Sequence, residues 1–232
     1  MYSITEACVK INQMSTEWFN CKYGVKQGDC LSPTLFSLFI NDLAKEIKAL
    51  DKGVKANTLN VSLLMYADDV VFLAETEENL QIMLDTLDNW IKQWGISINN
   101  KKSNFVHFRP KKSELTKFKF GIANKPLENV SEYKYLGVYF NEHLDFNTNA
   151  TTLCQASGRA LGGIVSKYKQ TNFMGYSTYT KLYENCVIPV MNYCSGVWGY
   201  KNLTRLTRFS NEQCVYSWAY TNSHRLHHSM VI

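Results

Sequence analysis

The sequence has no paired-cysteine motif and no long apolar run, and its first residues do not show the pattern of a signal peptide. Its seven cysteines are odd in number and lack a C-x-x-C pair, so we expect reduced thiols in an intracellular protein of the nucleus or cytoplasm. Apolar helical patterns place Cys186 and Cys214 in the core. No stretch approaches the roughly 20 apolar residues of a membrane span, and the first six residues lack the basic and apolar regions of a signal peptide. We therefore expect no membrane partner.

Acidic residues are scarce in the last third of the chain. Residues 151–232 contain 8 Lys/Arg and 2 Asp/Glu, whereas residues 1–150 contain 17 and 18. The full chain of 232 residues is 45% hydrophobic and 19% charged, as in an ordinary globular protein of one large or two small domains. A basic C-terminal part beside an acidic turn indicates a polyanionic partner.

The most informative segment is Tyr66-Ala67-Asp68-Asp69, which lies between two short apolar runs. The runs, 61–65 and 70–74, predict buried strands, and Asp favours turns, so the segment predicts a β-hairpin with two carboxylates at its tip. Adjacent carboxylates repel each other unless a positive charge lies between them, and hard divalent cations prefer oxygen ligands. The pattern indicates metal-assisted phosphoryl chemistry, with a merely solvated turn as the alternative.

Periodicity along the chain predicts an α+β fold in two parts. One helix should begin with Ser32 as N-cap and Pro33 in the first turn, and a second should run from Thr76 to Gly95. Three segments predict strands: 96–98, 104–108 and 133–140. Helices then predominate from about residue 147, over 160–169, 178–187 and 206–220. We expect a sheet domain over 1–145 and a helical domain over 146–232 that packs against it.

A glycine-rich segment precedes the first predicted helix. Gly24 and Gly28 allow the backbone to approach a ligand closely, and Gln27 between them presents an amide. Such a turn before a helix N-terminus suits a nucleotide, with a tight structural turn as the alternative. A basic stretch offers a similar choice between nucleic-acid binding and a solvated face: Lys101, Lys102, Arg109, Lys111, Lys112, Lys117 and Lys119.

Together these segments resemble reverse transcriptases. Residues 24–36 read Gly-x-x-Gln-Gly-x-x-Leu-Ser-Pro-x-Leu-Phe, and this block followed by Tyr-Ala-Asp-Asp is similar to the palm of that polymerase family. Gly95–Ser103 resembles the block after the second palm helix, and Tyr135-Leu136-Gly137 resembles the turn called the primer grip. Two features resemble the non-LTR (LINE-type) retrotransposon branch: Ala67 replaces the methionine usual in retroviral enzymes, and the Leu-Ser-Pro helix start is typical of non-LTR elements and group II introns. Segments between 182 and 199, including Tyr193, resemble the region after the palm in such elements.

The resemblance implies a partial polymerase palm over 1–145 and a helical, thumb-like region over 146–232. It implies an RNA-directed DNA polymerase that adds dNTPs to a DNA primer on an RNA template, with two Mg²⁺ ions, or Mn²⁺, held by Asp68 and Asp69. The basic helical region would contact phosphates without regard to sequence. The other implied roles are Lys102 in catalysis beside the triphosphate, Gln27, Gly28, Tyr66 and Ala67 at the nucleotide and template, and Tyr135, Leu136 and Gly137 on the primer.

One element of the family pattern is missing from this sequence. The family has another metal-binding aspartate on a strand upstream of the Gly24 block, whereas the first aspartate here is Asp29, and Glu6 and Glu17 lie outside any apolar strand. Removal of such a charge contact typically costs roughly several kcal/mol of transition-state stabilisation. We therefore expect an N-terminally truncated chain, from a truncated gene model or a degenerate element. By itself it should have little polymerase activity and, because the palm sheet would lack a strand, poor solubility.

Two other functions account for fewer residues. A non-catalytic nucleic-acid-binding remnant would bind primer–template without synthesis. A metal-dependent phosphohydrolase explains the acidic turn but neither the Gln-Gly block nor the segment 135–137. A zinc site at the C-terminal end is also disfavoured, because no paired cysteines accompany Cys214, His224, His227 and His228.

Overall fold

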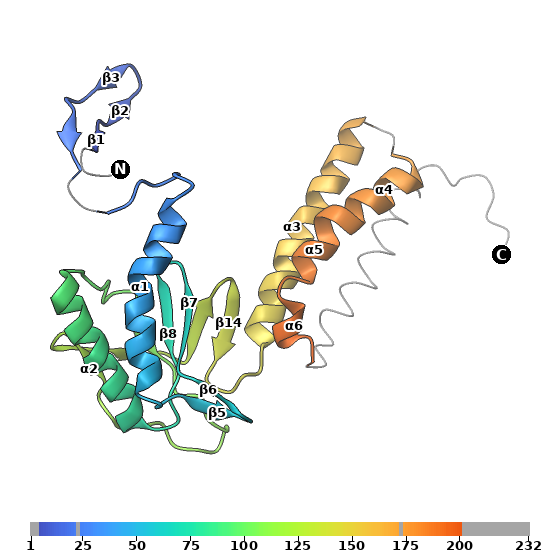
Figure 1. Cartoon of the computed structure of the whole chain (residues 1–232). Coiled ribbons are helices and arrows are strands. Elements are labelled where there is room, and N and C mark those ends of the chain that lie inside the picture. Colours follow the sequence, from blue (N-terminus) through green and yellow to red (C-terminus); the bar gives the residue numbers. More distant parts are fainter. Residues whose placement is uncertain (1–4, 22–23, 172–173, 201–232) are drawn as a thin grey trace. The chain divides into compact units, whose positions relative to one another are not determined.

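The computed structural model describes residues 5–21, 24–171 and 174–200. They belong to two compact units, the first drawn from Met1–Ser103 and Lys117–Leu127 and the second from Asn104–Thr116 and Glu128–Ile232. Each unit combines helices with small, two-stranded sheets, which confirms the predicted α+β class (Figure 1). None of the described helices is long and apolar enough to cross a membrane. The predicted helix 206–220, Cys214 and the three C-terminal histidines lie outside the described residues.

The described strands of the first unit form antiparallel pairs between segments close in sequence. The pairs are β1 (Glu6–Ala7) with β4 (Phe19–Asn20), β2 (Lys10–Ile11) with β3 (Met14–Ser15), β5 (Val54–Ala56) with β6 (Leu59–Val61), β7 (Leu63–Tyr66) with β8 (Asp69–Phe72), and β10 (Gly121–Ile122) with β11 (Lys125–Pro126). Pairing between neighbouring segments closes only short loops, which keeps the entropic cost of each hairpin small.

Helix α1 (Ser32–Ala49) begins where it was predicted, but Ser32 does not act as its N-cap. The N-cap residue is Leu31, which makes no side-chain capping bond, and Pro33 lies in the first turn. The Ser32 hydroxyl instead donates a hydrogen bond to the carbonyl oxygen of Lys26 at 2.5 Å. The preference of serine for helix starts predicted the boundary, but the hydroxyl is used to hold the preceding loop.

Helix α2 (Glu77–Trp94) begins and ends where it was predicted. The Thr76 hydroxyl accepts a hydrogen bond from the Asn79 amide at 3.2 Å, and Gly95 ends the helix with a left-handed φ of 64°. Figure 1 shows α1 beside β7 and β8 with α2 alongside it. The buried apolar side chains of these elements form one core: Leu43, Ile47, Leu63, Met83, Trp90 and Ile91.

The predicted strands after α2 are shorter than expected. Residues 96–98 form no strand, and 104–108 reduces to β9 (Asn104–Phe105), which pairs in parallel with β12 (Glu128–Asn129). Residues 133–140 are divided between β13 (Glu132–Tyr135) and β14 (Val138–Asn141). The single predicted strand was wrong because Leu136 and Gly137 both adopt left-handed φ values, 46° and 85°, and reverse the chain.

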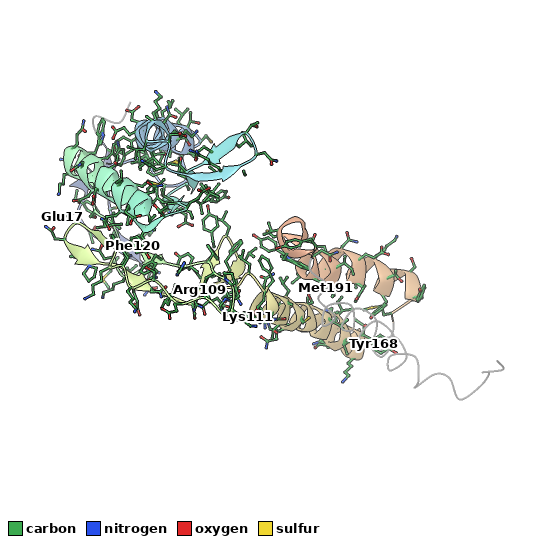
Figure 2. The ribbon with its side chains drawn as sticks, turned by 90° about the horizontal axis from the view of Figure 1, so that it is seen from below. Glu17, Arg109, Lys111, Phe120, Tyr168 and Met191 are labelled. Atoms are coloured by element: carbon green, nitrogen blue, oxygen red, sulfur yellow. The ribbon has the colours of Figure 1, made fainter. Side chains whose placement is uncertain are left out.

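The helices of the second unit form a hairpin. Helix α3 (Asn147–Thr171) lies beside α4 (Tyr176–Leu182), the π-helical turn η1 (Tyr183–Val187) and α5 (Ile188–Met191), and α6 (Ser195–Trp198) follows (Figure 1). Met191 packs with Leu153 and Trp198 in one core near the start of α3, and the side chain of Met191 is labelled in Figure 2. A second core contains Leu161, Tyr179 and Val187.

Cys186 is exposed, so its predicted place in the core was wrong. It lies within η1, where the π-helical turn places more residues in each turn than an α-helix does. The burial expected from α-helical spacing is therefore shifted, and Val187, the next residue, is fully buried instead.

Candidate active site

The segment Tyr66–Asp69 forms the predicted hairpin turn. Tyr66 and Asp69 are paired across the end of β7 and β8, which leaves Ala67 and Asp68 as a two-residue loop. Ala67 has a φ of 51°, in the left-handed region that residues with a Cβ rarely adopt. The turn is therefore tight, and it places Asp68 at the tip and Asp69 at the first position of β8.

The two faces of this hairpin have different environments. Directly opposed residues share a face and successive residues alternate, so Leu63, Met65 and Phe72 lie on the face that packs against α1. Tyr66 and Asp69 lie on the opposite face, and the Tyr66 side chain is 64% exposed. The core thus fixes the strands while the polar face of the turn stays open to solvent.

Asp68 and Asp69 are both exposed, and within the described ranges neither carboxylate forms an ion pair. Carboxylate oxygens of this kind are ligands of hard divalent cations. The described residues contain no group of three or more His, Cys, Asp or Glu arranged to hold a metal ion. The donor type at the turn therefore fits such a cation, while the number of described ligands is smaller than a closed metal site requires.

The Gln27–Gly28 segment is exposed, and hydrogen bonds of the flanking residues Lys26 and Asp29 fix it to the start of α1. Gly24 and Gly28 have φ values of 91° and 89°, and a Cβ added at either would meet no atom within 4 Å. The side chain of Asp29 accepts a hydrogen bond from the Leu31 amide at 2.9 Å, and the Ser32 hydroxyl is bonded to the Lys26 carbonyl. The left-handed backbone conformation therefore favours glycine at both positions, and no protein atom crowds either of them.

The remaining predicted site residues lie on two other turns. Lys102 is exposed in the turn after α2, where its amide donates to the Asn99 carbonyl at 3.0 Å. Tyr135, Leu136 and Gly137 form the end of the β13–β14 hairpin in the second unit. The structure thus brings Tyr66, Ala67, Asp68 and Asp69 together in one turn and joins the Gln27–Gly28 loop to the helix on which that hairpin packs.

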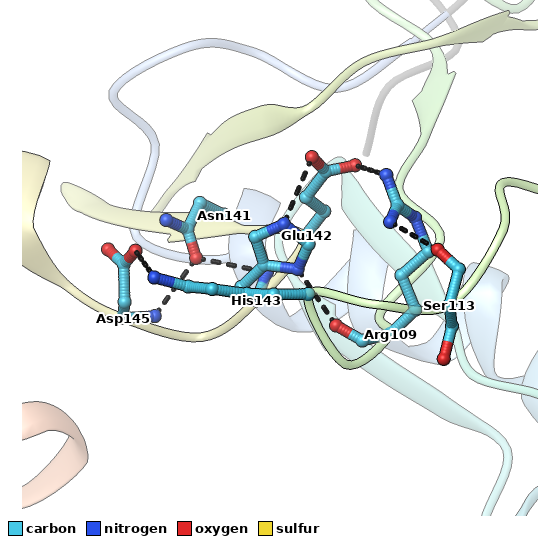
Figure 3. A network of polar contacts seen from close by, with 7 residues as sticks. Arg109, Ser113, Asn141, Glu142, His143 and Asp145 are labelled. Atoms are coloured by element: carbon cyan, nitrogen blue, oxygen red, sulfur yellow. Dashed lines mark hydrogen bonds and ion pairs between the residues drawn. The ribbon is translucent and has the colours of Figure 1, made fainter.

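Part of the predicted basic stretch is used inside the protein. Arg109 Nη2 lies 2.9 Å from Glu142 Oε2, and the two side chains are 15% and 22% exposed. Arg109 Nη1 also donates to the carbonyl of Ser113 at 2.7 Å (Figure 3). His143 Nδ1 lies 2.9 Å from the Arg109 carbonyl, which can only accept, so Nδ1 is the donor. Arg109 therefore joins the loop before Thr116 to the end of β14.

Lys111 belongs to the edge of the same network. Its Nζ lies 3.9 Å from Asp145 Oδ2, and the Asn147 amide donates to Asp145 Oδ1 at 3.2 Å. Partial burial raises the pKa of Asp145, but the hydrogen bonds from Asn147 and Asn141 and the Lys111 charge outweigh it, so the pKa lies below its usual value. Lys112, Lys117 and Lys119 are exposed. Their exposure is compatible with nucleic-acid binding and with a solvated face.

The described site residues thus comprise a hairpin turn with two exposed carboxylates and an exposed glycine-rich loop at the start of α1. The family model described as "Reverse transcriptase (RNA-dependent DNA polymerase)" matches residues 1–140, and the chain belongs to this family. The family predicted from the sequence, including its non-LTR retrotransposon type, is confirmed by this match and by the relatives that follow.

The chain is similar to several curated proteins of mobile elements. It is 28% identical over 193 residues to the RNA-directed DNA polymerase from mobile element jockey of Drosophila funebris, covering 80% of this chain and 20% of the relative. It is 35% identical over 133 residues to the Pol polyprotein from type-2 retrotransposable element R2DM of Drosophila melanogaster, covering 54% and 12%. The R2 polyprotein of Nasonia vitripennis is 27% identical over 151 residues, covering 62% and 15%. The chain thus spans 20% or less of the length of these relatives.

Sequence reasoning missed two residues that shape the site. Ser32 was predicted to cap the helix, whereas its hydroxyl donates to the Lys26 carbonyl. Its position in the Leu-Ser-Pro motif was the signal that singled it out. Tyr193 was quoted in the resemblance but given no role, and its hydroxyl donates to the carbonyl of Leu136 at 2.9 Å. A contact between residues 57 positions apart leaves no signal in a single sequence.

Proposed function

We propose that this chain carries the nucleotidyl-transfer centre of an RNA-directed DNA polymerase of a non-LTR retrotransposon. The observation that carries the proposal is the Tyr66–Asp69 turn, whose two carboxylates are exposed while the strands behind them are fixed by the core. Membership of the reverse transcriptase family supports polymerisation over other metal-assisted phosphoryl chemistry.

Asp68 and Asp69 are the residues that would hold divalent metal, Mg²⁺ in the first place. When bound, such a cation neutralises phosphate charge and favours deprotonation of a primer 3′-hydroxyl. Asp68 is the firmer ligand in this proposal because it occupies the tip of the turn, and Asp69 supports it from β8. A further carboxylate is needed for a complete two-metal site, and the described residues contain no third acidic group at this place.

The other predicted residues take supporting roles in the proposal. Gln27 and Gly28, in the loop anchored by Ser32, border the nucleotide and the template together with Tyr66 and Ala67. Lys102 interacts with the triphosphate, and the turn Tyr135–Gly137 holds the primer strand. Residues 1–145 act as a partial palm, and 146–232 act as a thumb that contacts phosphates, as the net charge of the latter part favours.

Primer extension tests this proposal. The chain should be compared with the same chain joined to the polymerase segment that precedes the matched region in the jockey element of Drosophila funebris. With an RNA template, a DNA primer, dNTPs and Mg²⁺, we expect the joined chain to synthesise DNA at least about 10²-fold faster, because the family pattern places a further metal-binding aspartate in the added segment.

The two negative results of this experiment have different meanings. Equal and Asp68-dependent synthesis by the chain alone would contradict the need for a further ligand. Failure of both chains to bind the primer–template at low salt would contradict the proposed function itself.

A further inference from the structure

The hairpin turn Leu136–Gly137 is held by a side chain from the helical part of the second unit. Tyr193 lies between α5 and α6, and its Oη donates a hydrogen bond to the Leu136 carbonyl oxygen at 2.9 Å. The ring also covers Gly137, because a Cβ added there would lie 2.9 Å from Tyr193 Cε1 and 3.3 Å from Oη. The phenol therefore packs on one residue of the turn and bonds to the other.

The backbone of this turn is strained at Leu136. Leu136 has a φ of 46°, in the left-handed region that a residue with a Cβ rarely adopts. Leu136 is 39% exposed, so little burial offsets the strain. The Tyr193 hydrogen bond stabilises the carbonyl orientation that this conformation requires.

Tyr193 is itself fixed to the core. Its carbonyl oxygen accepts a hydrogen bond from Trp198 Nε1 at 2.8 Å. Trp198 is 6% exposed and packs with Val138 and Phe146, so the support starts from buried residues. A continuous set of contacts thus runs from the core through Trp198 and Tyr193 to the turn.

The strands that flank the turn present a surface suited to a nucleic-acid strand. Lys134 and Tyr139 are paired across the hairpin, on the face opposite to the core residue Val138. Lys134 Nζ lies 5.2 Å from the centre of the Tyr139 ring. Lys134 is exposed and its charge suits a phosphate, so the direction in which the turn is held affects a bound strand.

We infer that Tyr193 is a positioning residue that fixes the Leu136–Gly137 turn for contact with the primer strand. The inference rests on the proposed function for the role of that turn, and on the Tyr193–Leu136 contact for the residue. Tyr193 acts through the turn and touches none of the reacting atoms.

The test uses the 232-residue chain with Tyr193→Phe, which keeps the ring and removes the hydroxyl. Amide hydrogen exchange across residues 135–139 should become about fivefold faster, the effect expected from loss of one hydrogen bond. Affinity for an RNA–DNA primer–template should fall about as much, while affinity for the template RNA alone stays unchanged. Tyr176→Phe, at an exposed tyrosine of α4, is the matched control and should change none of these values.

The outcomes separate this inference from the function on which it rests. Unchanged exchange in Tyr193→Phe, or an equal loss of affinity for both nucleic acids, would overturn the inference and leave the proposed function standing. A parent chain without primer–template affinity would contradict the proposed function, and the exchange rates would still decide whether Tyr193 fixes the turn. Gly137→Ala, which places a methyl group against the Tyr193 ring, should reproduce the selective loss of primer–template affinity.

Discussion

Asp68→Asn should abolish DNA synthesis by the chain joined to the polymerase segment of the jockey element, with a loss of at least about 10²-fold. Asparagine has the same shape as aspartate but lacks the charge that a divalent cation requires from a ligand at this turn. Because Asp68 is exposed and forms no ion pair among the described residues, its replacement should leave the fold intact. Primer extension and thermal unfolding measured on the same preparation separate the two effects.

The controls for this variant come from the same unit. Asp69→Asn should give a smaller loss, since Asp69 supports the site from the first position of β8. Glu46→Gln removes an exposed carboxylate on α1 and should leave synthesis unchanged. If Asp68→Asn and Glu46→Gln behaved alike, the hairpin would be an ordinary solvated turn.

Arg109→Met should destabilise the second unit by about 2 kcal/mol without lowering nucleic-acid affinity. Methionine keeps much of the aliphatic packing but leaves Glu142 without the guanidinium 2.9 Å away and the Ser113 carbonyl without its donor. Loss of one partner of a fully buried pair costs about 3–5 kcal/mol, and the partial exposure of both side chains reduces that figure. Urea unfolding measures the change in free energy.

Lys112→Met is the matched control for Arg109→Met. Lys112 is exposed, so its replacement should leave the free energy of unfolding unchanged. If the basic stretch contacts phosphates, the variant should lower the salt dependence of primer–template binding by about one released ion.

Adding Glu142→Gln to Arg109→Met should recover part of the lost stability, because it removes the unpaired charge. A stable Arg109→Met protein with weakened nucleic-acid binding would assign Arg109 to the binding surface instead.

Local sequence signals predicted the parts of the fold that local physics determines. Thr76 and Gly95 delimit α2 because a hydroxyl cap and a left-handed glycine act within a few residues of the helix ends. The two apolar runs on either side of Tyr66–Asp69 predicted the hairpin, since short apolar strands and a turn former are both read from neighbouring residues. The family followed from the order and spacing of several such blocks.

The features that the sequence did not predict depend on hydrogen-bond partners that form only in the folded chain. The hydroxyl of Ser32 donates to the Lys26 carbonyl, and the guanidinium of Arg109 donates to Glu142, 33 positions away. The strand predicted over 133–140 failed at Leu136, whose left-handed φ accompanies a hydrogen bond from Tyr193. Hydropathy at these positions carries no information about such partners. The roles assigned to the site residues also depend on partners that hydropathy does not reveal, so these roles stay predictions.

The most direct measurement of the central claim is divalent-cation binding at the Tyr66–Asp69 turn of the chain itself. Titration with Mn²⁺, followed by paramagnetic broadening of backbone amide signals, should broaden the signals of Asp68 and Asp69 first. We expect a dissociation constant of about 10⁻³ M, because few ligands without a closed cage bind such ions weakly. Asp68→Asn should abolish the broadening and Glu46→Gln should leave it unchanged. Broadening spread evenly over exposed carboxylates, or undiminished in Asp68→Asn, would contradict the assignment of this turn as the metal-holding centre of the polymerase.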